Sequence, residues 1–253
     1  MAATHRTPLA MGDAFRDAAR VLTRRAPILL LMSMALVFTG AAGAAWLRYH
    51  PPLDGAGVLV GLGNWLADWF TMTIPYSLFI SAASWTVAEV LEGRSPTVGE
   101  TLSHGLRLAF PVLTIQILYL LGTVAGALLL VVPGIIVALM WILTPSALIV
   151  ERLGIIDAFK RSRALTKGHR WALLGLMAAY SLAAVALEWM IFRITSPGMS
   201  FVLAANAPVN AYGVVPLFTA LTAPLNCVVM TAIYMRLRSG HRALADVTAE
   251  VFA

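Results

Sequence analysis

Five stretches of the chain, from 17 to 43 residues long, contain no Asp, Glu, Lys or Arg. An α-helix needs about 20 mostly apolar residues to cross the hydrocarbon core of a bilayer. The two longest stretches, 108–150 and 194–235, are each long enough for two such helices. Runs of this length fit a bilayer better than the interior of a soluble domain. The chain is therefore predicted to be an all-α integral membrane protein.

Composition supports this prediction and excludes other classes. Only 12% of the residues are charged and 60% are hydrophobic, whereas soluble domains contain about 25% charged residues. The single cysteine, Cys227, excludes a disulfide framework and a cysteine metal cluster. The high hydrophobic and low charged fractions also exclude a secreted disulfide scaffold, a disordered tail and a nucleic-acid-binding module.

Turn residues divide the two longest stretches. Pro133-Gly134 lies near the middle of the first and predicts a tight turn between two spans. The first half of the second is rich in Pro, Gly and Asn and predicts a loop, which leaves one span. The predicted spans, within a single domain 1–253, are 27–47, 69–91, 109–131, 135–150, 171–192 and 214–234.

The basic residues predict the orientation. Of 18 Lys and Arg residues, 16 fall on one side of the predicted membrane, and only Arg48 and Arg193 fall on the other. Loops rich in Lys and Arg stay in the cytoplasm. Six spans also place both termini on one side. We therefore expect a multi-pass protein of the bacterial inner (cytoplasmic) membrane with cytoplasmic N- and C-termini. The net charge of +6 is expected to set this orientation.

Three cytoplasmic segments resemble one another. Residues 13–16 (Asp-Ala-Phe-Arg) recur at 157–160 (Asp-Ala-Phe-Lys), and a looser copy begins at Glu100 behind a capping box with Thr97. Each segment predicts an amphipathic helix in the membrane interface. Two interpretations remain. Either the chain contains three units, each an interfacial helix followed by a transmembrane hairpin, or the segments are alike only in composition.

One motif runs from residue 133 to residue 171. Its residues are Pro133, Gly134, Ile135, Pro145, Glu151, Gly154, Ala158, Lys160, Arg161, Ser162, Leu165, Thr166, Lys167, Gly168 and Trp171. The motif resembles a broad family of poorly characterised bacterial multi-pass membrane proteins, which includes the membrane domain of some glycerophosphoryl diester phosphodiesterases. This resemblance implies an integral membrane fold and a link to lipids or the envelope. The 253 residues contain no phosphodiesterase domain, so that activity is not implied.

Glu151 is expected at the cytoplasmic end of the fourth span, close in sequence to Arg161 and Arg163. A carboxylate there can tie the interfacial helix to the span through a charge-assisted hydrogen bond. The alternative, a proton or cation site, is less favoured because functional carboxylates lie deeper in the membrane. The other residues predicted to act as structural anchors are Pro133, Gly134, Pro145 and Gly168.

Glu188 is predicted one turn inside the outer end of the fifth span. Ionisable residues at that depth usually face a partner or a cavity, although Glu188 could instead extend to the outer head groups or pair with Arg193. The cations of helix 155–167, together with the neighbouring Arg170, predict contact with anionic lipid. Alternatively, they only set the orientation of the protein in the membrane. The candidate ligand-binding residues are therefore Glu188, Arg161, Arg163, Lys167 and Arg170.

Small residues and prolines mark further features of the spans. Gly122 and Gly126 allow a close helix contact, expected within the bundle rather than at a dimer seam. Pro145, Pro216 and Pro224 are expected to interrupt spans four and six, and interrupted helices often border binding sites in transporters.

Catalytic and metal-binding patterns are absent from the sequence. The five histidines are scattered, and no HExxH, P-loop or GxSxG motif occurs. No metal, cofactor or enzymatic activity is expected. The favoured function is a non-enzymatic inner-membrane protein that binds or moves an amphiphile, with anionic membrane lipids as partners. The alternatives are a structural or regulatory partner of another membrane protein, in a homo- or hetero-oligomer, and a membrane-embedded enzyme.

Overall fold

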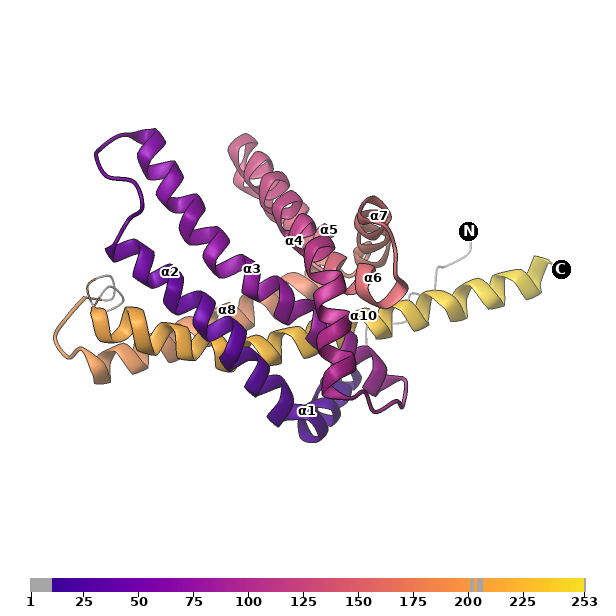
Figure 1. Ribbon diagram of the computed structural model, residues 1–253. Coiled ribbons are helices and arrows are strands. Elements are labelled where there is room, and N and C mark those ends of the chain that lie inside the picture. The colour runs from indigo at the N-terminus through magenta and orange to yellow at the C-terminus, as the bar shows by residue number, and fades with distance from the viewer. Residues whose placement is uncertain (1–10, 201–202, 204–206, 253) are drawn as a thin grey trace.

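The computed structural model describes the backbone of residues 11–200, 203 and 207–252, and the side chains of 12–200, 203 and 207–240. This part of the chain is helical and contains no strand (Figure 1). Six helical segments are long and apolar enough to cross a membrane: Gly12–Tyr49, Val58–Leu91, Val98–Leu129, Val131–Glu151, Arg170–Thr195 and Asn210–Gly240. The predicted all-helical class and the number of candidate spans are confirmed.

The helices follow the chain in a simple order. Their bounds are α1 (Met11–Ser33), the π-helix η1 (Met34–Phe38), α2 (Thr39–Tyr49), α3 (Val58–Leu91), α4 (Val98–Leu129), α5 (Val131–Trp141), α6 (Thr144–Glu151), α7 (Ile155–Thr166), α8 (Arg170–Thr195), the π-helix η2 (Asn210–Val214) and α10 (Val215–Phe252). Parts of two predicted segments, 1–10 at the N-terminus and 201–202 and 204–206 in the loop after α8, lie outside the described residues.

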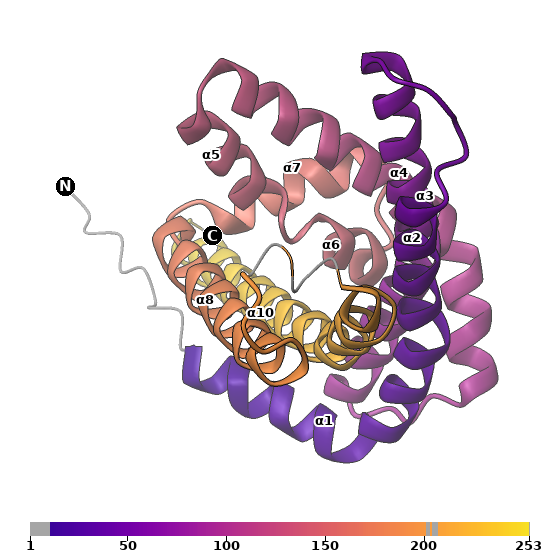
Figure 2. The same ribbon diagram turned by 90° about the vertical axis from the view of Figure 1, so that its left-hand side faces the viewer.

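Only one of the three expected interfacial segments forms a helix of its own. Glycines flank α7, with Gly154 before it and Gly168 at φ +95° after it. The segments at 13–25 and 98–107 instead belong to α1 and α4, which continue into their spans without a break. Figure 2 shows α1 running across α10, which it contacts, before the chain bends toward α2.

The α4–α5 hairpin turns earlier than predicted. The chain reverses at Leu130, whose backbone is extended, and not at Pro133-Gly134. Both residues belong to the first turn of α5, where a proline fits because the first helical N–H groups have no partner within the helix. The third span therefore ends at Leu129, not 131, and the fourth begins at Val131, not 135.

Proline interrupts only one of the two spans predicted to be broken. The fourth span divides into α5 and α6 at Ile142 and Leu143, and Pro145 lies in the first turn of α6. By contrast, α10 continues through Pro224, so the predicted interruption there is wrong, and Pro216 lies in the first turn of α10 directly after the π-helix η2. A single proline removes one backbone hydrogen bond, and packing against α1 and α3 holds α10 together.

The best-packed core surrounds α10, whereas α8 lies at the edge. Tyr234 and Ile233 of α10 are fully buried together with Phe79 of α3 and Leu29 of α1. Within α8 only Leu173 and Phe192 are buried. Figure 2 shows α8 beside α10 at the outside of the bundle. This loosely packed helix forms one wall of the cavity described next.

Candidate binding cavity

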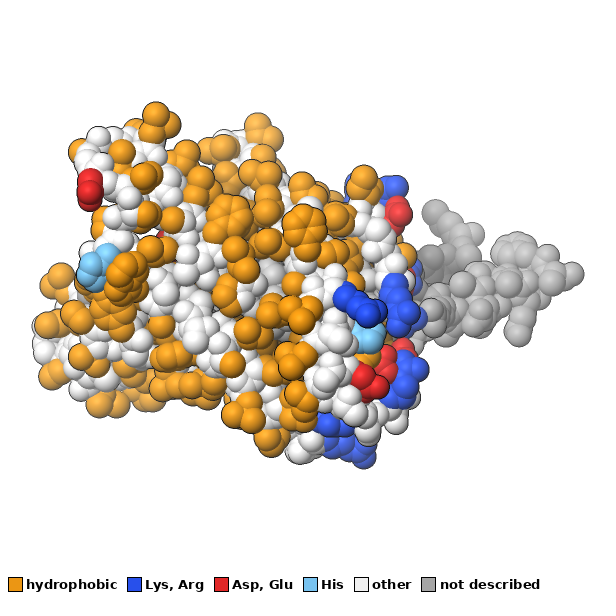
Figure 3. All heavy atoms as spheres, viewed as in Figure 1, with side chains coloured by type: hydrophobic (Ala, Val, Ile, Leu, Met, Phe, Trp, Pro, Cys, Tyr) orange, Lys and Arg blue, Asp and Glu red, His pale blue; other side chains and the backbone are white. Residues whose placement is uncertain are grey.

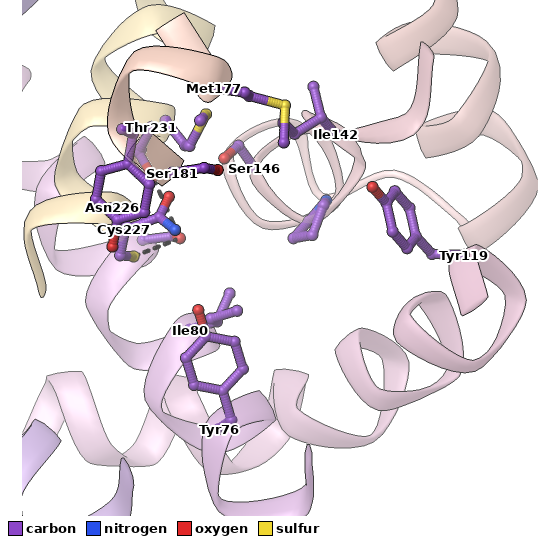
Figure 4. A pocket seen from close by; sticks show the side chains of 14 residues that line it. Tyr76, Ile80, Tyr119, Ile142, Ser146, Met177, Ser181, Asn226, Cys227 and Thr231 are labelled. Carbon is purple, nitrogen blue, oxygen red and sulfur yellow. Dashed lines mark hydrogen bonds between the residues drawn. The ribbon is translucent and has the colours of Figure 1, made fainter. Parts of the chain in front are cut away.

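A cavity of about 290 Å³ lies between α3, α4, α6, α8 and α10. The residues that line it are Tyr76, Ile80, Ser84, Tyr119, Ile142, Pro145, Ser146, Met177, Tyr180, Ser181, Asn226, Cys227, Met230 and Thr231. Figure 4 shows the hydroxyls of Tyr76 and Tyr119 pointing into the cavity from different sides, with Asn226 on a third. Ser181 lines the cavity and is also exposed, so the cavity reaches the protein surface beside α8.

The interruption of the fourth span helps to form this cavity. Because α5 ends at Trp141 and α6 starts at Thr144, the fourth span is broken beside the cavity. Ile142, Pro145 and Ser146 lie at this break and form part of the wall. The loosely packed helix α8 contributes Met177 and Ser181 to the wall.

One group of polar side chains on the wall is internally satisfied. The Ser84 hydroxyl lies 3.3 Å from Cys227 Sγ and accepts a hydrogen bond of 3.2 Å from Thr231 Oγ1. Elsewhere on α3, Ser77, Ser81 and Thr86 donate to backbone carbonyls three or four residues earlier. Hydroxyls in these helices therefore commonly use a partner within the protein.

A second group on the wall has no such partner. Within the described part of the chain, six side chains of the cavity make no hydrogen bond: Tyr76, Tyr119, Ser146, Tyr180, Ser181 and Asn226. None of their polar atoms is among the fully buried side-chain atoms that lack a hydrogen bond, so these groups remain accessible. The cavity therefore offers several free hydroxyls and one free amide, and no charged side chain.

Glu188, the predicted intramembrane site, does not line the cavity. It lies partly exposed on α8, and no ion pair joins it to another described residue. The alternative pairing with Arg193 is not found either, because the guanidinium of Arg193 lies over the Trp189 ring, 5.6 Å from its centroid.

Arg161 contacts Glu151 in the structure. Its Nε lies 3.1 and 3.0 Å from the two carboxylate oxygens, and its Nη2 donates to Oε1 at 2.9 Å. Burial alone lowers the pKa of Arg161, but the hydrogen bonds and charge of Glu151 outweigh it and raise the pKa above its ordinary value. This pair joins α6 to α7. While it is formed, Arg161 cannot grip a phosphate with the same two nitrogens.

The other predicted ligand cations lie near this pair in sequence but outside the cavity. Arg163 and Lys167 are exposed, and neither forms an ion pair within the described residues. Arg170 is partly buried at the start of α8, and its Nε is sealed without a hydrogen-bond partner. The predicted ligand residues are thus not gathered in one site.

An ionic network joins several helices at the end of the molecule where the charges gather in Figure 3. Arg238 of α10 lies 3.4 Å from Glu151 and 3.6 Å from Glu92, which follows α3. Two residues earlier, Arg236 pairs with Asp17 of α1 at 2.6 Å. Tyr234 is fully buried near Glu151 and interacts with it and with Arg161, although its hydroxyl lacks good hydrogen-bond geometry. The C-terminal half of α10 is therefore tied to α1, α3 and α6.

Of the residues that the sequence pointed to, Pro145 of the interrupted span lines the cavity, whereas the polar residues of the wall were missed because they carry no charge. Acidic or basic residues at membrane depth were the expected sign of a site, and none of them lines the cavity. Asn226, two residues after Pro224, and the adjacent Tyr180 and Ser181 were visible as polar residues within apolar runs. Only the fold brings them together, since they come from α8 and α10.

Comparison with known proteins adds a family. Residues 97–237 match the model of a domain of unknown function, DUF7847. No curated protein and no solved structure matches the chain. The matched segment covers more than half of the chain, from the capping box of α4 to the ionic network on α10, and it includes most of the cavity wall. The chain therefore belongs to the DUF7847 family.

Proposed function

We propose that this protein is a non-enzymatic protein of the bacterial inner membrane that binds or moves an amphiphile, lipid or envelope-related. The observation that carries the proposal is the cavity with free hydroxyl and amide groups inside an apolar bundle. A polar group in hydrocarbon without a hydrogen bond costs several kcal/mol. Six such groups around one space therefore favour an occupant that supplies their partners.

The size of the cavity suits part of an amphiphile. A volume of about 290 Å³ lies just below the range of about 300–1,000 Å³ typical of small-molecule pockets. It suits a head group or a short length of chain, but not a whole two-chain lipid. The opening beside α8 provides a lateral route, along which the remaining chains would extend into the bilayer.

The basic end of the molecule supports a link to lipid as well. Arg163 in the last turn of α7 and Lys167 directly after it are exposed, and each cation near an anionic membrane surface contributes about 1 kcal/mol. We propose that this end faces the cytoplasm, with α7 and the amphipathic starts of α1 and α4 near the anionic head groups. The resemblance to membrane domains of glycerophosphoryl diester phosphodiesterases points to lipid in the same way.

Filling the cavity tests the proposed function. Met177→Trp places a larger side chain on the wall, whereas Leu182→Trp adds the same ring on the exposed side of the same helix. We expect Met177→Trp to lower the amount of co-purified amphiphile at least tenfold, a loss of about 1.4 kcal/mol. Native mass spectrometry of both variants in the same detergent measures the retained amphiphile.

The control decides what the result means. Leu182→Trp should retain as much amphiphile as the unmodified protein, because Leu182 is 72% exposed and points away from the core. Equal retention by both variants would contradict binding in the cavity. It would favour a structural or regulatory role, for which the exposed apolar surface of α8 offers a contact face.

The proposed orientation has its own test. Single cysteines at Ser200 and Ser239, in a Cys227→Ser background, lie beyond α8 and on the C-terminal part of α10. An impermeant thiol reagent applied to cells with a permeabilised outer membrane should label Ser200→Cys and leave Ser239→Cys unlabelled until the inner membrane is opened. The reverse pattern would overturn the orientation.

A further inference from the structure

We infer that the cavity takes an amphiphile with an uncharged head group carrying hydroxyl or amide groups, and excludes anionic head groups. This inference rests on the proposed function and specifies the class of amphiphile. It separates two lipid contacts on one protein, a neutral head group between the spans and anionic head groups at the basic end.

The charge distribution is the first reason. No Asp, Glu, Lys, Arg or His lines the cavity. Two cations of the ionic network, Arg161 and Arg238, are committed to Glu151. A phosphate drawn into the cavity would lose its water without gaining a counter-charge, and this costs several kcal/mol per ion. An uncharged head group avoids that cost.

The hydrogen-bond inventory is the second reason. Tyrosine and serine hydroxyls can each donate one hydrogen bond and accept others, and the Asn226 amide does both. They come from five helices, α3, α4, α6, α8 and α10, so they can meet a small polar group from several directions at once. A site built to hydrogen-bond a hydroxyl discriminates strongly against analogues that leave its groups unpaired.

The aromatic rings and the methionines complete the fit. Tyr76 and Tyr119 present ring surface as well as a hydroxyl, and Ile80, Met177 and Met230 make the rest of the wall apolar. A glycerol or amide backbone next to the start of an acyl chain combines the same two characters. The wall therefore matches the junction between an uncharged head group and its chain.

A competition experiment tests this choice. The purified full-length protein is equilibrated in detergent with monoacylglycerol, diacylglycerol and ceramide, against phosphatidic acid and phosphatidylglycerol with the same chains. Native mass spectrometry then measures what each variant retains. Asn226→Leu removes the amide at similar volume, and the pair Arg163→Gln and Lys167→Gln removes two exposed cations at the basic end.

The two variants should each lower the retention of a different class of lipid. We expect Asn226→Leu to lower retention of the neutral lipids about tenfold, the effect of one hydrogen bond in an apolar site, and to leave the anionic lipids unchanged. The double cation variant should lower only the anionic lipids. Tyr119→Phe, which removes a single hydroxyl, replaces Asn226→Leu if that variant fails to fold.

The outcomes separate the inference from the proposed function. Anionic lipid retained in place of neutral lipid, and lost in Asn226→Leu, would overturn the inference while leaving amphiphile binding in place. Two results would contradict the proposed function and the inference together. One is that the protein retains neither class of lipid. The other is that it retains neutral lipid in amounts that neither Asn226→Leu nor Met177→Trp changes.

Discussion

Replacing Gly126 with valine is expected to destabilise the protein by about 3 kcal/mol, the upper range for overpacking a closely packed contact. A side chain at Gly126 would begin 3.0 Å from the Cα and 3.2 Å from the nitrogen of Gly134. These are backbone atoms of α5, so no flexible side chain can move aside. The α4–α5 hairpin would have to separate, and thermal unfolding in detergent measures the loss.

Gly99 provides the matched control for Gly126. It lies on the same helix, is exposed, and has no atom within 4 Å of the position a side chain would take. Gly99→Val should therefore leave the melting temperature within a degree or two, since surface substitutions usually change stability by less than about 0.5 kcal/mol. Equal loss in both variants would show that the contact with Gly134 does not hold the hairpin.

The contact between Gly126 and Gly134 also shows what the pair of small residues on α4, Gly122 and Gly126, packs against. Gly122 packs against the Trp141 ring and Gly126 against Gly134, both on α5. The pattern is thus used inside the bundle, as expected, and this face of α4 is not free for a dimer seam.

Replacing Glu151 with glutamine should give the second large loss of stability. The substitution keeps the size of the side chain but removes the charge that faces Arg161 and Arg238. Breaking a buried pair costs about 3–5 kcal/mol. The side chain of Arg161 is still 28% exposed, and solvent therefore screens part of the interaction. We expect Glu151→Gln to lower the free energy of unfolding by about 2 kcal/mol. The measurement is again thermal unfolding in detergent.

Two further variants isolate the role of the pair. Glu92→Gln removes a carboxylate that also contacts Arg238, but the Glu92 side chain is 40% exposed, so its loss should cost less. Arg161→Gln combined with Glu151→Gln should cost less than the sum of the single changes, because the double variant removes the Arg161 charge that Glu151→Gln alone leaves unpaired, while Arg238 keeps Glu92 in both. Strict additivity would show that the two side chains do not stabilise each other. Unchanged melting of Glu151→Gln with a lost cellular phenotype would instead favour the alternative, a proton or cation site.

Local signals in the sequence predicted the helices well. The charge-free stretches predicted six spans, and the capping box at Thr97 and Glu100 is present with both of its hydrogen bonds. The sequence proximity of Glu151 and Arg161 also pointed to their contact. Each of these features depends on composition or on residues close together in the chain, which a sequence displays directly.

Features that depend on three dimensions were predicted less well. Pro133-Gly134 resembled a turn, but proline and glycine fit the first turn of a helix equally well, and only the extended Leu130 shows where the chain reverses. The wall of the cavity joins Tyr76, Tyr119 and Asn226 from three spans, and no spacing within the sequence relates them. Arg161 was predicted both as a neighbour of Glu151 and as a candidate ligand-binding residue, and only the fold shows that it is committed to Glu151.

Saturable photolabelling tests amphiphile binding in the cavity most directly. A single-chain glycerolipid with a photoreactive group next to its head is irradiated with the purified protein, and the labelled residues are identified by peptide mapping. We expect labelling at Tyr76, Tyr119 or Asn226 that excess unlabelled lipid removes and that Met177→Trp abolishes. Labelling confined to outward-facing residues such as Leu182, and unaffected by excess lipid, would contradict binding in the cavity.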